Sequence, residues 1–416
     1  QTQVIDGTGK FLIPALWDMH IHLTNEPSQA VTREWMMPLL LAYGVTGIRE
    51  MGGDWQRIQQ LQIDLLAGKL KGPHIIAAGP FVDGPGFVDK PVTTPDEARQ
   101  RVKELKALGV AFIKVQANLV PDVYQAVLAE AAKQKLVVAG HIPEAISAFV
   151  VAQSNQRSIE HLSPILPGDA GILLACSNKE AALRADMLAL KNFKGQELRQ
   201  RERSLETQLI ETYDAKKCAG LFRLLAKKQI FVTPTQIWAE RLLPLNAQDL
   251  LDATALSLMP RTQAEKLTAR RTQRIATMPP ENFVLLQRVA DIAQTLVTQL
   301  HRARVPLLAG TDALDGDVIP GLSLHQELER FVRAGLTPLE ALQTTTRNAA
   351  RYFGTLAESG TIERGKRADL LLLDADPLRD IHNTQKIHAI IHNGKLIDAT
   401  QRAALLKAVA AFAETH

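Results

Sequence analysis

Short hydrophobic runs alternate with longer amphipathic stretches along most of the chain, which is typical of a parallel sheet wrapped by helices. Helices fit between the runs, for example Pro95–Leu108, which follows Thr94, and Pro121–Gln134. Eight runs predict strands: Leu12–Leu23, Val45–Gly52, His74–Val82, Phe112–Ala117, Leu136–Ile142, Ser158–Leu162, Ile230–Thr235 and Pro306–Asp312. Eight strands with intervening helices predict an α/β fold, the (β/α)8 TIM barrel.

The two ends of the chain have a different pattern. After a predicted helix at Thr337–Tyr352, the segments Gly360–Gly365 and Ala368–Asp374 alternate or run apolar. Ala389–Ile397 follows, with Asn393-Gly394 as a hairpin turn. Gln3–Phe11 resembles a matching strand with an Asp6-Gly7 turn. We therefore expect a small β-sandwich module built from both termini.

These patterns predict the domain organisation. Residues 1–11 and 355–416 would form the β-module, and residues 12–354 the catalytic barrel. One long interruption, roughly 164–228, lies between the sixth and seventh predicted strands and is largely charged and helical. An insertion of that length on the catalytic face usually shapes substrate access.

Composition and charge narrow the function classes. The 416 residues are 46% hydrophobic and 22% charged, as in globular proteins. The net charge of +4 is small for this length, and basic residues alternate with acidic ones along the chain. Nucleic acid is therefore not an expected partner. No run of about 18 apolar residues predicts a transmembrane segment. Cys176 and Cys218 could be bridged or free. The chain begins at Gln1 without a leader, and we expect that an upstream segment has been removed.

Potential metal ligands stand where the predicted strands end. The first strand ends Asp18-Met19-His20-Ile21-His22, and alternate side chains of a strand share a face, so both imidazoles point into the barrel. Further candidates end four other strands: Lys114, His141, His161 and Asp312. Barrels keep their chemistry at the carboxyl ends of their strands. The set predicts a metal centre.

Lys114 lies inside an apolar run, Phe112-Ile113-Lys114-Val115. Burial beside cations lowers the pKa of an amine, and a neutral amine can add carbon dioxide to give a carbamate. A carbamate carries one negative charge and two oxygens and can bridge two cations. The alternative is an ion pair between Lys114 and a carboxylate at the barrel mouth. The neighbouring histidines favour the carbamate.

These residues predict a division of roles. His20, His22 and Asp312 would hold the more buried of two divalent ions, and His141 and His161 the outer one. A hydroxide shared by both ions would be the nucleophile, because metal binding lowers the pKa of water to about 7. Asp312 would take the proton of the attacking water and pass it to the leaving group. Zinc is the default for imidazole-rich ligation, with manganese or cobalt as substitutes.

The sequence resembles the amidohydrolase superfamily, closest to its imidazolonepropionase-like and Xaa-Pro/Xaa-Arg dipeptidase branch. The resemblance covers nearly the whole chain and rests on Val4–Gly9, Leu12–His22 and Gly365–Leu370. It implies a carboxylated lysine on strand four, and it implies the same six ligands at the matching positions. The dipeptidases carry a tyrosine just after the strand-five histidine, where this chain has His141-Ile142-Pro143.

Other side chains have two interpretations each. Arg49 could hold a substrate carboxylate, or form an ion pair with Glu50 or with groups around Asp312. Trp238 could form a pocket wall or pack under the insertion. His325 could line the pocket, cap a helix or lie in the core. Four histidines away from the catalytic strand ends are interpreted as structural: His74, His382, His388 and His392.

The sequence therefore predicts a binuclear metal-dependent hydrolase that cleaves a C–N amide bond in a small molecule, a dipeptide or an N-acyl amino acid. One alternative is hydrolysis of a cyclic amide, lactone or phosphoester by the same site. A second is an inactive barrel used as a binding protein. The sequence leaves open whether the protein forms a homo-oligomer. The His141-Ile142-Pro143 pattern together with the long insertion favours an exported protein.

Overall fold

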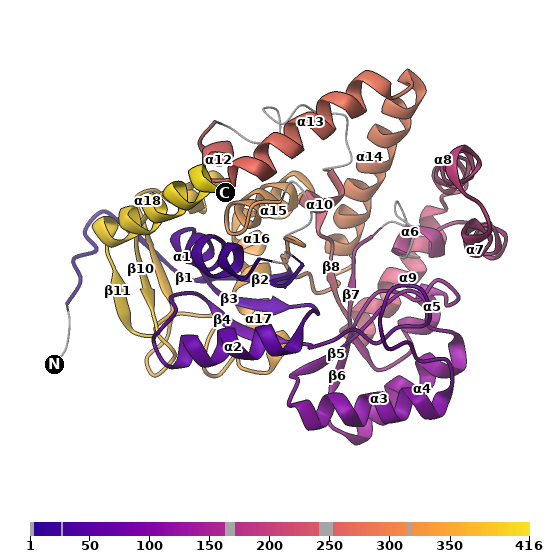
Figure 1. The fold of residues 1–416 in the computed structure, drawn as a ribbon, viewed down its shortest axis with the longest axis horizontal. Helices are drawn as coiled ribbons and strands as arrows, with labels where there is room; N and C mark the ends of the chain where they lie inside the picture. The colour runs from indigo at the N-terminus through magenta and orange to yellow at the C-terminus, as the bar shows by residue number, and fades with distance from the viewer. Residues whose placement is uncertain (1–3, 26–27, 163–170, 241–252, 314–317) are drawn as a thin grey trace.

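The computed structural model describes residues 4–25, 28–162, 171–240, 253–313 and 318–416 (Figure 1). It is an α/β protein in which parallel strands are surrounded by helices. Two parallel sheets carry the candidate site, and one antiparallel sheet joins the two ends of the chain. Within the described residues, no helix is long and apolar enough to cross a bilayer.

The first parallel sheet has the order β2-β3-β4 and the second β5-β6-β7-β8. Their strands are β2 (Leu16–Ile21), β3 (Val45–Glu50), β4 (His74–Ala77), β5 (Phe112–Val115), β6 (Val137–Gly140), β7 (Gln156–Glu160) and β8 (Phe231–Thr233). Seven of the eight predicted runs thus contain a strand of these sheets. Because neighbouring strands are parallel, their carboxyl ends meet at one edge of each sheet.

The eighth predicted strand, Pro306–Asp312, is wrong as a continuous strand. Isolated parallel bridges join Leu307 to Val232 on β8 and Ala313 to Ile21 on β2. Proline offers no N–H to a ladder, and Asp312 has a φ of 60°, so the run cannot keep extended geometry to its end. A further bridge, Val82 to Val115, joins the first parallel sheet to the second. The closed barrel stays a prediction.

Two predicted helices are confirmed, and the residues at their ends explain why they begin and end where they do. Helix α3 (Pro95–Leu108) opens with a capping box, in which Thr94 and Glu97 each satisfy the other's backbone N–H. It ends at Gly109, whose φ of 82° suits glycine. Helix α4 (Pro121–Lys133) likewise begins with a proline. Four short helical segments complete this half of the chain: η1 (Val31–Met36), α1 (Met37–Ala42), α2 (Trp55–Leu66) and α5 (Ala148–Val151).

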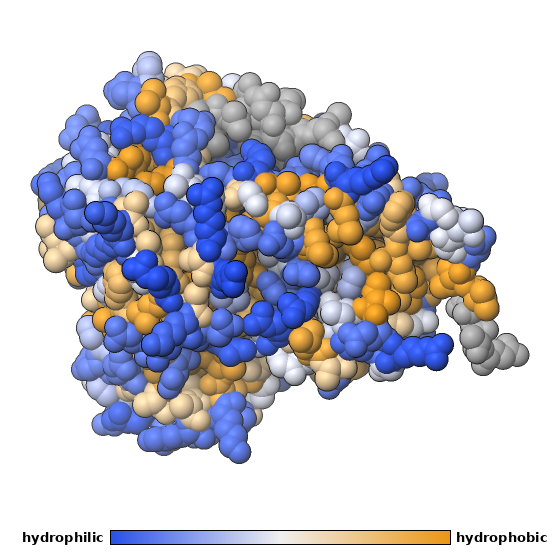
Figure 2. Space-filling view, turned by 180° about the vertical axis from the view of Figure 1, so that it is seen from behind, coloured by the Kyte–Doolittle hydropathy of each residue, from blue (hydrophilic) through white to orange (hydrophobic). Residues whose placement is uncertain are grey.

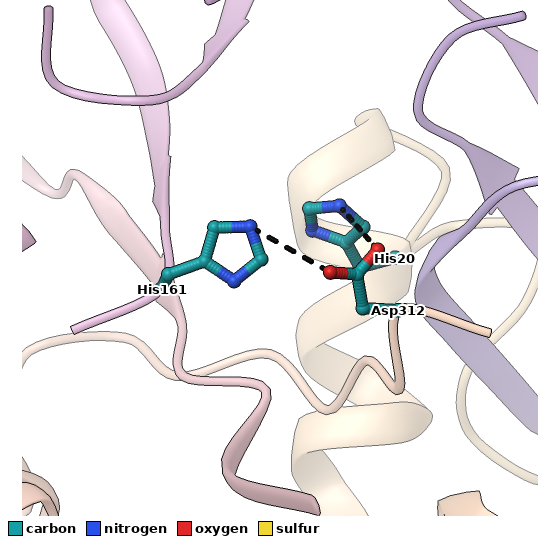
Figure 3. Close-up of side chains that lie close together, drawn as sticks. All are labelled: His20, His161 and Asp312. Carbon is teal, nitrogen blue, oxygen red and sulfur yellow. Dashed lines mark ion pairs between the residues drawn. The ribbon is translucent and has the colours of Figure 1, made fainter. Parts of the chain in front are cut away.

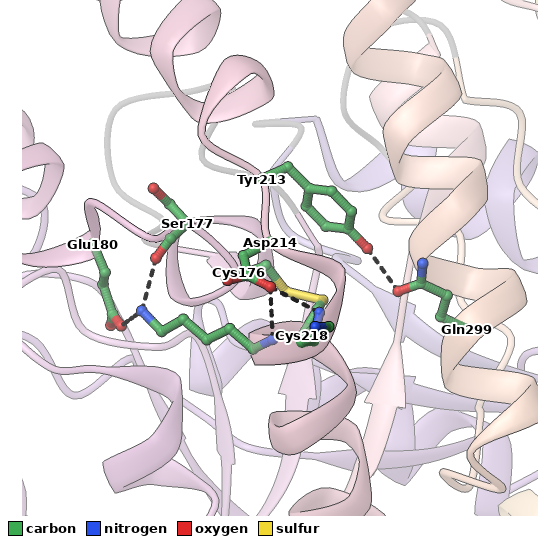
Figure 4. Close-up of a disulfide and its surroundings, with 9 residues drawn as sticks. Cys176, Ser177, Glu180, Tyr213, Asp214, Cys218 and Gln299 are labelled. Carbon is green, nitrogen blue, oxygen red and sulfur yellow. Dashed lines mark hydrogen bonds and ion pairs between the residues drawn. A yellow bond between two sulfur atoms is a disulfide. The ribbon is translucent and has the colours of Figure 1, made fainter.

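The insertion between β7 and β8 is helical, as expected, within its described residues. It contains α6 (Gly171–Ala175), α7 (Glu180–Ala189), η2 (Leu190–Asn192), α8 (Gly195–Glu211) and α9 (Ala215–Lys228). Cys176 and Cys218 form a disulfide that closes the segment carrying α7 and α8 (Figure 4). Beside it, the Tyr213 hydroxyl donates to Gln299 at 2.7 Å and so ties the insertion to the following helices.

A group of helices follows β8: α10 (Gln236–Glu240), α12 (Ala253–Ser257), α13 (Arg261–Thr277), α14 (Pro280–Arg302) and α15 (Leu322–Arg333). The single helix predicted at Thr337–Tyr352 is two helices, α16 (Pro338–Thr345) and α17 (Arg347–Phe353). The break lies at Thr346, whose φ of −125° and ψ of −89° are not helical. The helical period continues across the break, so the sequence pattern did not reveal it.

The antiparallel sheet has the order β1-β9-β10-β11 and lies at the left of Figure 1. Its strands are β1 (Phe11–Pro14), β9 (Leu370–Leu373), β10 (Ile387–His392) and β11 (Lys395–Ile397). The predicted hairpin turn is confirmed, with φ of 52° at Asn393 and 71° at Gly394. Turns at 360–366 precede β9, and the short helix η3 (Ile381–Gln385) precedes β10. Helix α18 (Ala399–Thr415) follows the sheet.

Two strand predictions at the ends are wrong. Residues 4–10 form no strand, because the Asp6 carboxylate accepts from the Thr8 N–H and hydroxyl and holds a local turn. Gly360–Gly365 is also not a strand and contains turns. The predicted run Leu12–Leu23 divides at Ala15: the chain before it pairs with β9 and the chain after it with β3. The expected domain boundary at residue 12 therefore falls inside β1, and the two-sheet sandwich stays a prediction.

Figure 2 shows the opposite face from Figure 1. Hydrophilic and hydrophobic residues intermix over most of it, and hydrophobic groups are more frequent toward its right-hand side. This mixture agrees with the thin, interleaved charge of the sequence. The candidate ligands His20, His22, Lys114, His161 and Asp312 are buried, and His141 is partly buried.

Candidate metal centre

Three buried side chains converge at the carboxyl ends of the parallel strands: His20, His161 and Asp312 (Figure 3). Each offers one ligand atom, and these atoms all lie within 4.8 Å of one another. The Asp312 carboxylate stands 3.5 Å from His20 Nε2 and 3.9 Å from His161 Nε2. His22 Nε2 approaches it from another side at 3.3 Å. Imidazole and carboxylate atoms at this spacing are a suitable donor set for a divalent cation.

The strands position these groups. His20 lies at the end of β2 and His22 directly follows it, so the alternation of a strand sends both rings toward the same side. His161 directly follows β7. Asp312 comes from the segment beside β2, where its N–H donates to the His20 carbonyl at 2.7 Å. Four side chains from three segments thus meet at one place.

Hydrogen bonds to the other ring nitrogen fix the orientation of three imidazoles. His22 Nδ1 lies 2.9 Å from the Gly52 carbonyl, which can only accept. His161 Nδ1 lies 2.6 Å from Thr235 Oγ1, whose own proton goes to the Pro234 carbonyl. Both Nδ1 atoms therefore carry the proton in the neutral rings. Their Nε2 lone pairs are left to face Asp312, the arrangement that a metal-binding histidine requires.

His20 is held in the same way by a buried ion pair. Its Nδ1 lies 3.0 Å from Glu160, which also accepts from Arg49 at 2.7 Å. Burial raises the pKa of Glu160, but the Arg49 charge outweighs it and the net shift is downward. Glu160 is therefore an anion that accepts the Nδ1–H of His20. His20 Nε2 is buried and has no hydrogen-bond partner in the part of the chain that the structure describes.

Burial and charge set the protonation of the cluster. Burial lowers the pKa of His161 to about 4 and that of His20 well below its usual range, against the attraction of Asp312. For His22 burial also acts downward, but its hydrogen bond to Asp312 raises the pKa overall. The histidine charges outweigh burial at Asp312 and hold its pKa well below the usual range. Near neutral pH the cluster thus offers the Asp312 anion and neutral imidazoles at His20 and His161.

Three residues at the site adopt the left-handed backbone region: His161 with φ of 65°, Thr235 with 47° and Asp312 with 60°. Side chains other than glycine and asparagine rarely adopt it, and the cost is about 1–3 kcal/mol each. The same conformation at Gln229 ends helix α9, a common place for it. At the site, two of these residues, His161 and Asp312, are candidate ligands, and the third, Thr235, is hydrogen-bonded to His161. Such strain accumulates where function requires a fixed geometry.

Lys114 and His141 lie close to the cluster but outside its tightest group. Lys114 is fully buried on β5, and its charge acts to lower the pKa of His20 and His161. The His141 ring centroid lies 5.0 Å from that of His161. The structure therefore brings all six predicted ligands to one region. It places His20, His161 and Asp312 within metal-binding distance of one another.

The residues with weaker predictions lie in different surroundings. Arg49 is fully buried and donates to Glu160, Ser158 and Thr233, so the ion pair expected with Glu50 forms with Glu160 instead. The Trp238 ring lies 5.2 Å from the His161 ring, beside the site.

His325 does not reach the cluster. Its two ring nitrogens bond to Thr384 Oγ1 and the Tyr43 carbonyl, at 2.8 and 2.9 Å. It is fully buried, so its place is in the core, one of the locations that the sequence left open.

A cavity of about 500 Å3 opens beside His141. Helices α7 and α8 of the insertion supply one wall, including Met187 and Leu205. Four carboxylates also line it: Asp83, Glu144, Glu202 and Glu206. Burial raises the pKa of Glu206 to about 7, and the nearby Glu202 adds to the shift. The cavity is large enough for a small peptide or acyl amino acid.

Parts of this chain are similar in sequence to known amidohydrolases. The model of the amidohydrolase family matches residues 251–397. Residues of this chain are 35% identical over 121 positions to ochratoxinase of Aspergillus niger, and 30% identical over 190 positions to imidazolonepropionase of Agrobacterium fabrum strain C58. The first match covers 28% of this chain and 24% of ochratoxinase, the second 42% and 43%. The chain thus matches less than half the length of either relative. The predicted resemblance to amidohydrolases is confirmed.

Solved structures show the amidohydrolase-like fold over nearly the whole chain. Bottromycin amidohydrolase superposes with a TM-score of 0.76 at 19% identity, covering 97% of this chain and 81% of that one. A Xaa-Pro dipeptidase with bound methionine in its active site gives 0.63 at 18% identity, covering 94% and 87%. At these identities the likeness concerns the fold. It supports the α/β architecture predicted from the sequence.

Sequence reasoning missed the groups that orient the ligands: Glu160, Thr235, the Gly52 carbonyl and Asp18. Asp18 accepts from the Thr311 hydroxyl and N–H and from the His20 N–H, and burial raises its pKa to about 7. One signal was available, because Asp18, His20 and His22 share one face of an otherwise apolar strand. A carboxylate immediately before His161 was a second signal.

Proposed function

We propose that this chain is a metal-dependent hydrolase of C–N amide bonds, with a dipeptide or N-acyl amino acid as substrate. The observation that carries the proposal is the set of buried Nε2 and carboxylate atoms within 4.8 Å, whose histidines are each held at Nδ1 by a protein acceptor. A hydrogen-bonded core network would not need to leave His20 Nε2 buried without a partner among the described residues. The donor set therefore fits a bound cation.

In this proposal the centre is binuclear. His20, His22 and Asp312 would hold one divalent ion, His141 and His161 would hold the second, and Lys114 would contribute to both as a carbamate. Carbamate formation joins the Lys114 nitrogen to the carbon of carbon dioxide and releases a proton. Zinc is the proposed metal. When bound, the ions lower the pKa of water and polarise the scissile carbonyl.

The residues of the chain do the remaining work. Asp312, an anion near neutral pH, accepts the proton of the attacking water and donates it to the departing amide nitrogen. Glu160 and Thr235 keep the rings of His20 and His161 oriented. Trp238 and the cavity beside His141 receive the substrate side chains. Arg49 acts through Glu160 and is a positioning residue.

We also propose that the two parallel sheets and the segment 306–313 together form a (β/α)8 barrel. Single bridges at Val82–Val115, Val232–Leu307 and Ile21–Ala313 connect the two parallel sheets and the segment 306–313 in succession. They support a (β/α)8 arrangement, with residues 12–354 as its extent and the terminal sheet as a separate module.

Metal content and turnover test the proposal together. The candidate centre of the purified protein should hold about two zinc-type ions per chain, and Lys114→Ala should lose metal from this centre. A panel of dipeptides and N-acyl amino acids should be cleaved, and chelation should abolish the cleavage. Full activity in metal-free protein would refute the proposal. Turnover only of a cyclic amide, lactone or phosphoester would move the substrate to the alternative class, and bound metal without any turnover would favour a binding protein.

A further inference from the structure

A second group of potential metal ligands lies away from the candidate centre. His74 is the first residue of β4, Asp369 directly precedes β9, and His392 ends β10. Their ligand atoms all lie within 4.8 Å of one another. The candidate centre lies at the carboxyl ends of the parallel strands, whereas His74 begins its strand. This group therefore lies at the junction of a parallel sheet with the antiparallel sheet.

The geometry is fixed by contacts from several segments. His74 Nε2 lies 3.3 Å from Asp369 Oδ2, and His392 Nδ1 lies 3.0 Å from Asp369 Oδ1. The two imidazole centroids are 4.8 Å apart. The Asn393 N–H donates to Asp369 Oδ1 at 2.8 Å, and the Ala15 N–H donates to the Asp369 carbonyl at 2.9 Å. The carboxylate is thus held in place between the two rings.

The contact of one ring nitrogen with the carboxylate is looser than a well-aligned hydrogen bond. His74 Nε2 is buried and makes no hydrogen bond within the described residues, although it faces Asp369. An ordinary histidine–aspartate pair would close this gap with a well-aligned hydrogen bond. A cation between the three residues would satisfy the nitrogen and the second carboxylate oxygen together. The spacing of the three ligand atoms, together with this loose contact, leaves room for a ligand between them.

Solvent reaches the group from a cavity of about 1040 Å3, which His74 and His392 line. An ion can enter there, and water can complete its coordination. Arg367 and Lys395 also line the cavity, and their charges oppose a cation. The Asp369 anion and two imidazoles have to outweigh that repulsion, and imidazole binds zinc-type ions more strongly than Mg²⁺ or Ca²⁺, which prefer oxygen ligands.

We propose that His74, Asp369 and His392 form a second metal site for a zinc-type divalent cation, with water as the remaining ligand. The ion would join the start of β4 to the start of β9 and the end of β10, and so fasten the antiparallel sheet to the parallel one. When Nδ1 of the neutral His392 ring takes the ion, the proton moves from Nδ1 to Nε2, so the ring stays neutral. The Asn393 amide, now 3.2 Å from His392 Nε2, then turns its oxygen to that nitrogen.

The test counts ions in the holoprotein. After dialysis against excess zinc, elemental analysis should find one ion fewer per chain in His74→Ala than in the wild type. His388→Ala is the matched control, because His388 lies on β10 with His392 and pairs with Asp374 at 3.1 Å, but does not belong to the group of three ligands. It should keep the wild-type count. Thermal melting should show a zinc-dependent rise in Tm for the wild type and His388→Ala that His74→Ala lacks.

A second variant keeps the test decisive. His392→Ala removes a different ligand of the same site, and it should lose the same ion if His74→Ala fails to fold. Equal zinc content and equal zinc-dependent Tm in wild type, His74→Ala and His392→Ala would overturn the proposal. The site is independent of the proposed function, since His20→Ala should remove metal from the candidate centre and leave this ion bound.

Discussion

Replacing Thr235 with valine tests whether His161 is oriented for metal binding. The Thr235 hydroxyl accepts the His161 Nδ1–H at 2.6 Å and donates to the Pro234 carbonyl at 2.8 Å, and the side chain is fully buried. Valine keeps the β-branched shape at the left-handed φ of 47°, so the substitution removes the hydrogen bonds with little change in packing.

The expected magnitude follows from those two bonds. Loss of an outer hydrogen bond to a metal-binding histidine usually costs about 10- to 100-fold in metal affinity, or about 1.4–2.7 kcal/mol. In the variant the His161 Nδ1–H and the Pro234 carbonyl lose their hydrogen-bond partner, and each loss lowers the free energy of unfolding of the metal-free protein by about 1–3 kcal/mol. Thr235→Val should therefore bind zinc about 10- to 100-fold more weakly and melt at a lower temperature without metal.

A chelator competition measures the affinity, and thermal melting of the metal-free protein measures the stability. Thr235→Ser is the control, because serine keeps the hydroxyl and should retain metal affinity near that of the wild type. Zinc affinity of Thr235→Val equal to that of Thr235→Ser, with the melting temperature lowered as expected, would refute the orienting role. His161 would then be held by its packing alone.

Three further predictions concern other parts of the site. Asp312→Asn should reduce kcat by more than 100-fold in the substrate panel, since the amide cannot accept the proton of the attacking water; near-normal kcat at full metal occupancy would contradict that role. Glu206 has a pKa of about 7 in the folded chain against 4.5 for the unfolded one, so its ionisation destabilises the fold as pH rises from about 4.5 to 7. In denaturant unfolding, Glu206→Gln should be as stable as the wild type at pH 4. At pH 8 it should be about 1–3 kcal/mol more stable, after allowance for solvent screening. An equal gain at pH 4 would contradict a raised pKa of Glu206. The disulfide closes a segment with a sequence separation of 42, so the double variant Cys176→Ser/Cys218→Ser should lose up to about 4 kcal/mol in the same assay, and an unchanged stability would show that the bridge is not formed in solution.

The sequence by itself determined the local structure. Thr94, Pro95 and Glu97 specify the start of α3, and Asn393-Gly394 specifies the β10–β11 hairpin. These signals act within a few residues, where backbone hydrogen bonding and side-chain size decide the conformation. The alternation along β2 likewise placed His20 and His22 on one face before any tertiary contact was known.

Only the tertiary structure decided which groups partner the ligands. Gly52, Glu160 and Thr235 come from three different strand ends, and no spacing rule connects them to the rings that they orient. The same holds for the break at Ala15, where the chain passes from one sheet to another because Asp369 and Gly44 each offer a carbonyl to neighbouring N–H groups.

The second histidine cluster shows the limit most clearly. His74 and His392 were interpreted as structural because neither lies at a predicted catalytic strand end. The packing of the two sheets places their rings 4.8 Å apart around one carboxylate. Sequence patterns report the preferences of neighbouring residues. Contacts between distant segments are set by how whole faces pack together, and a pattern of neighbours carries no record of that choice.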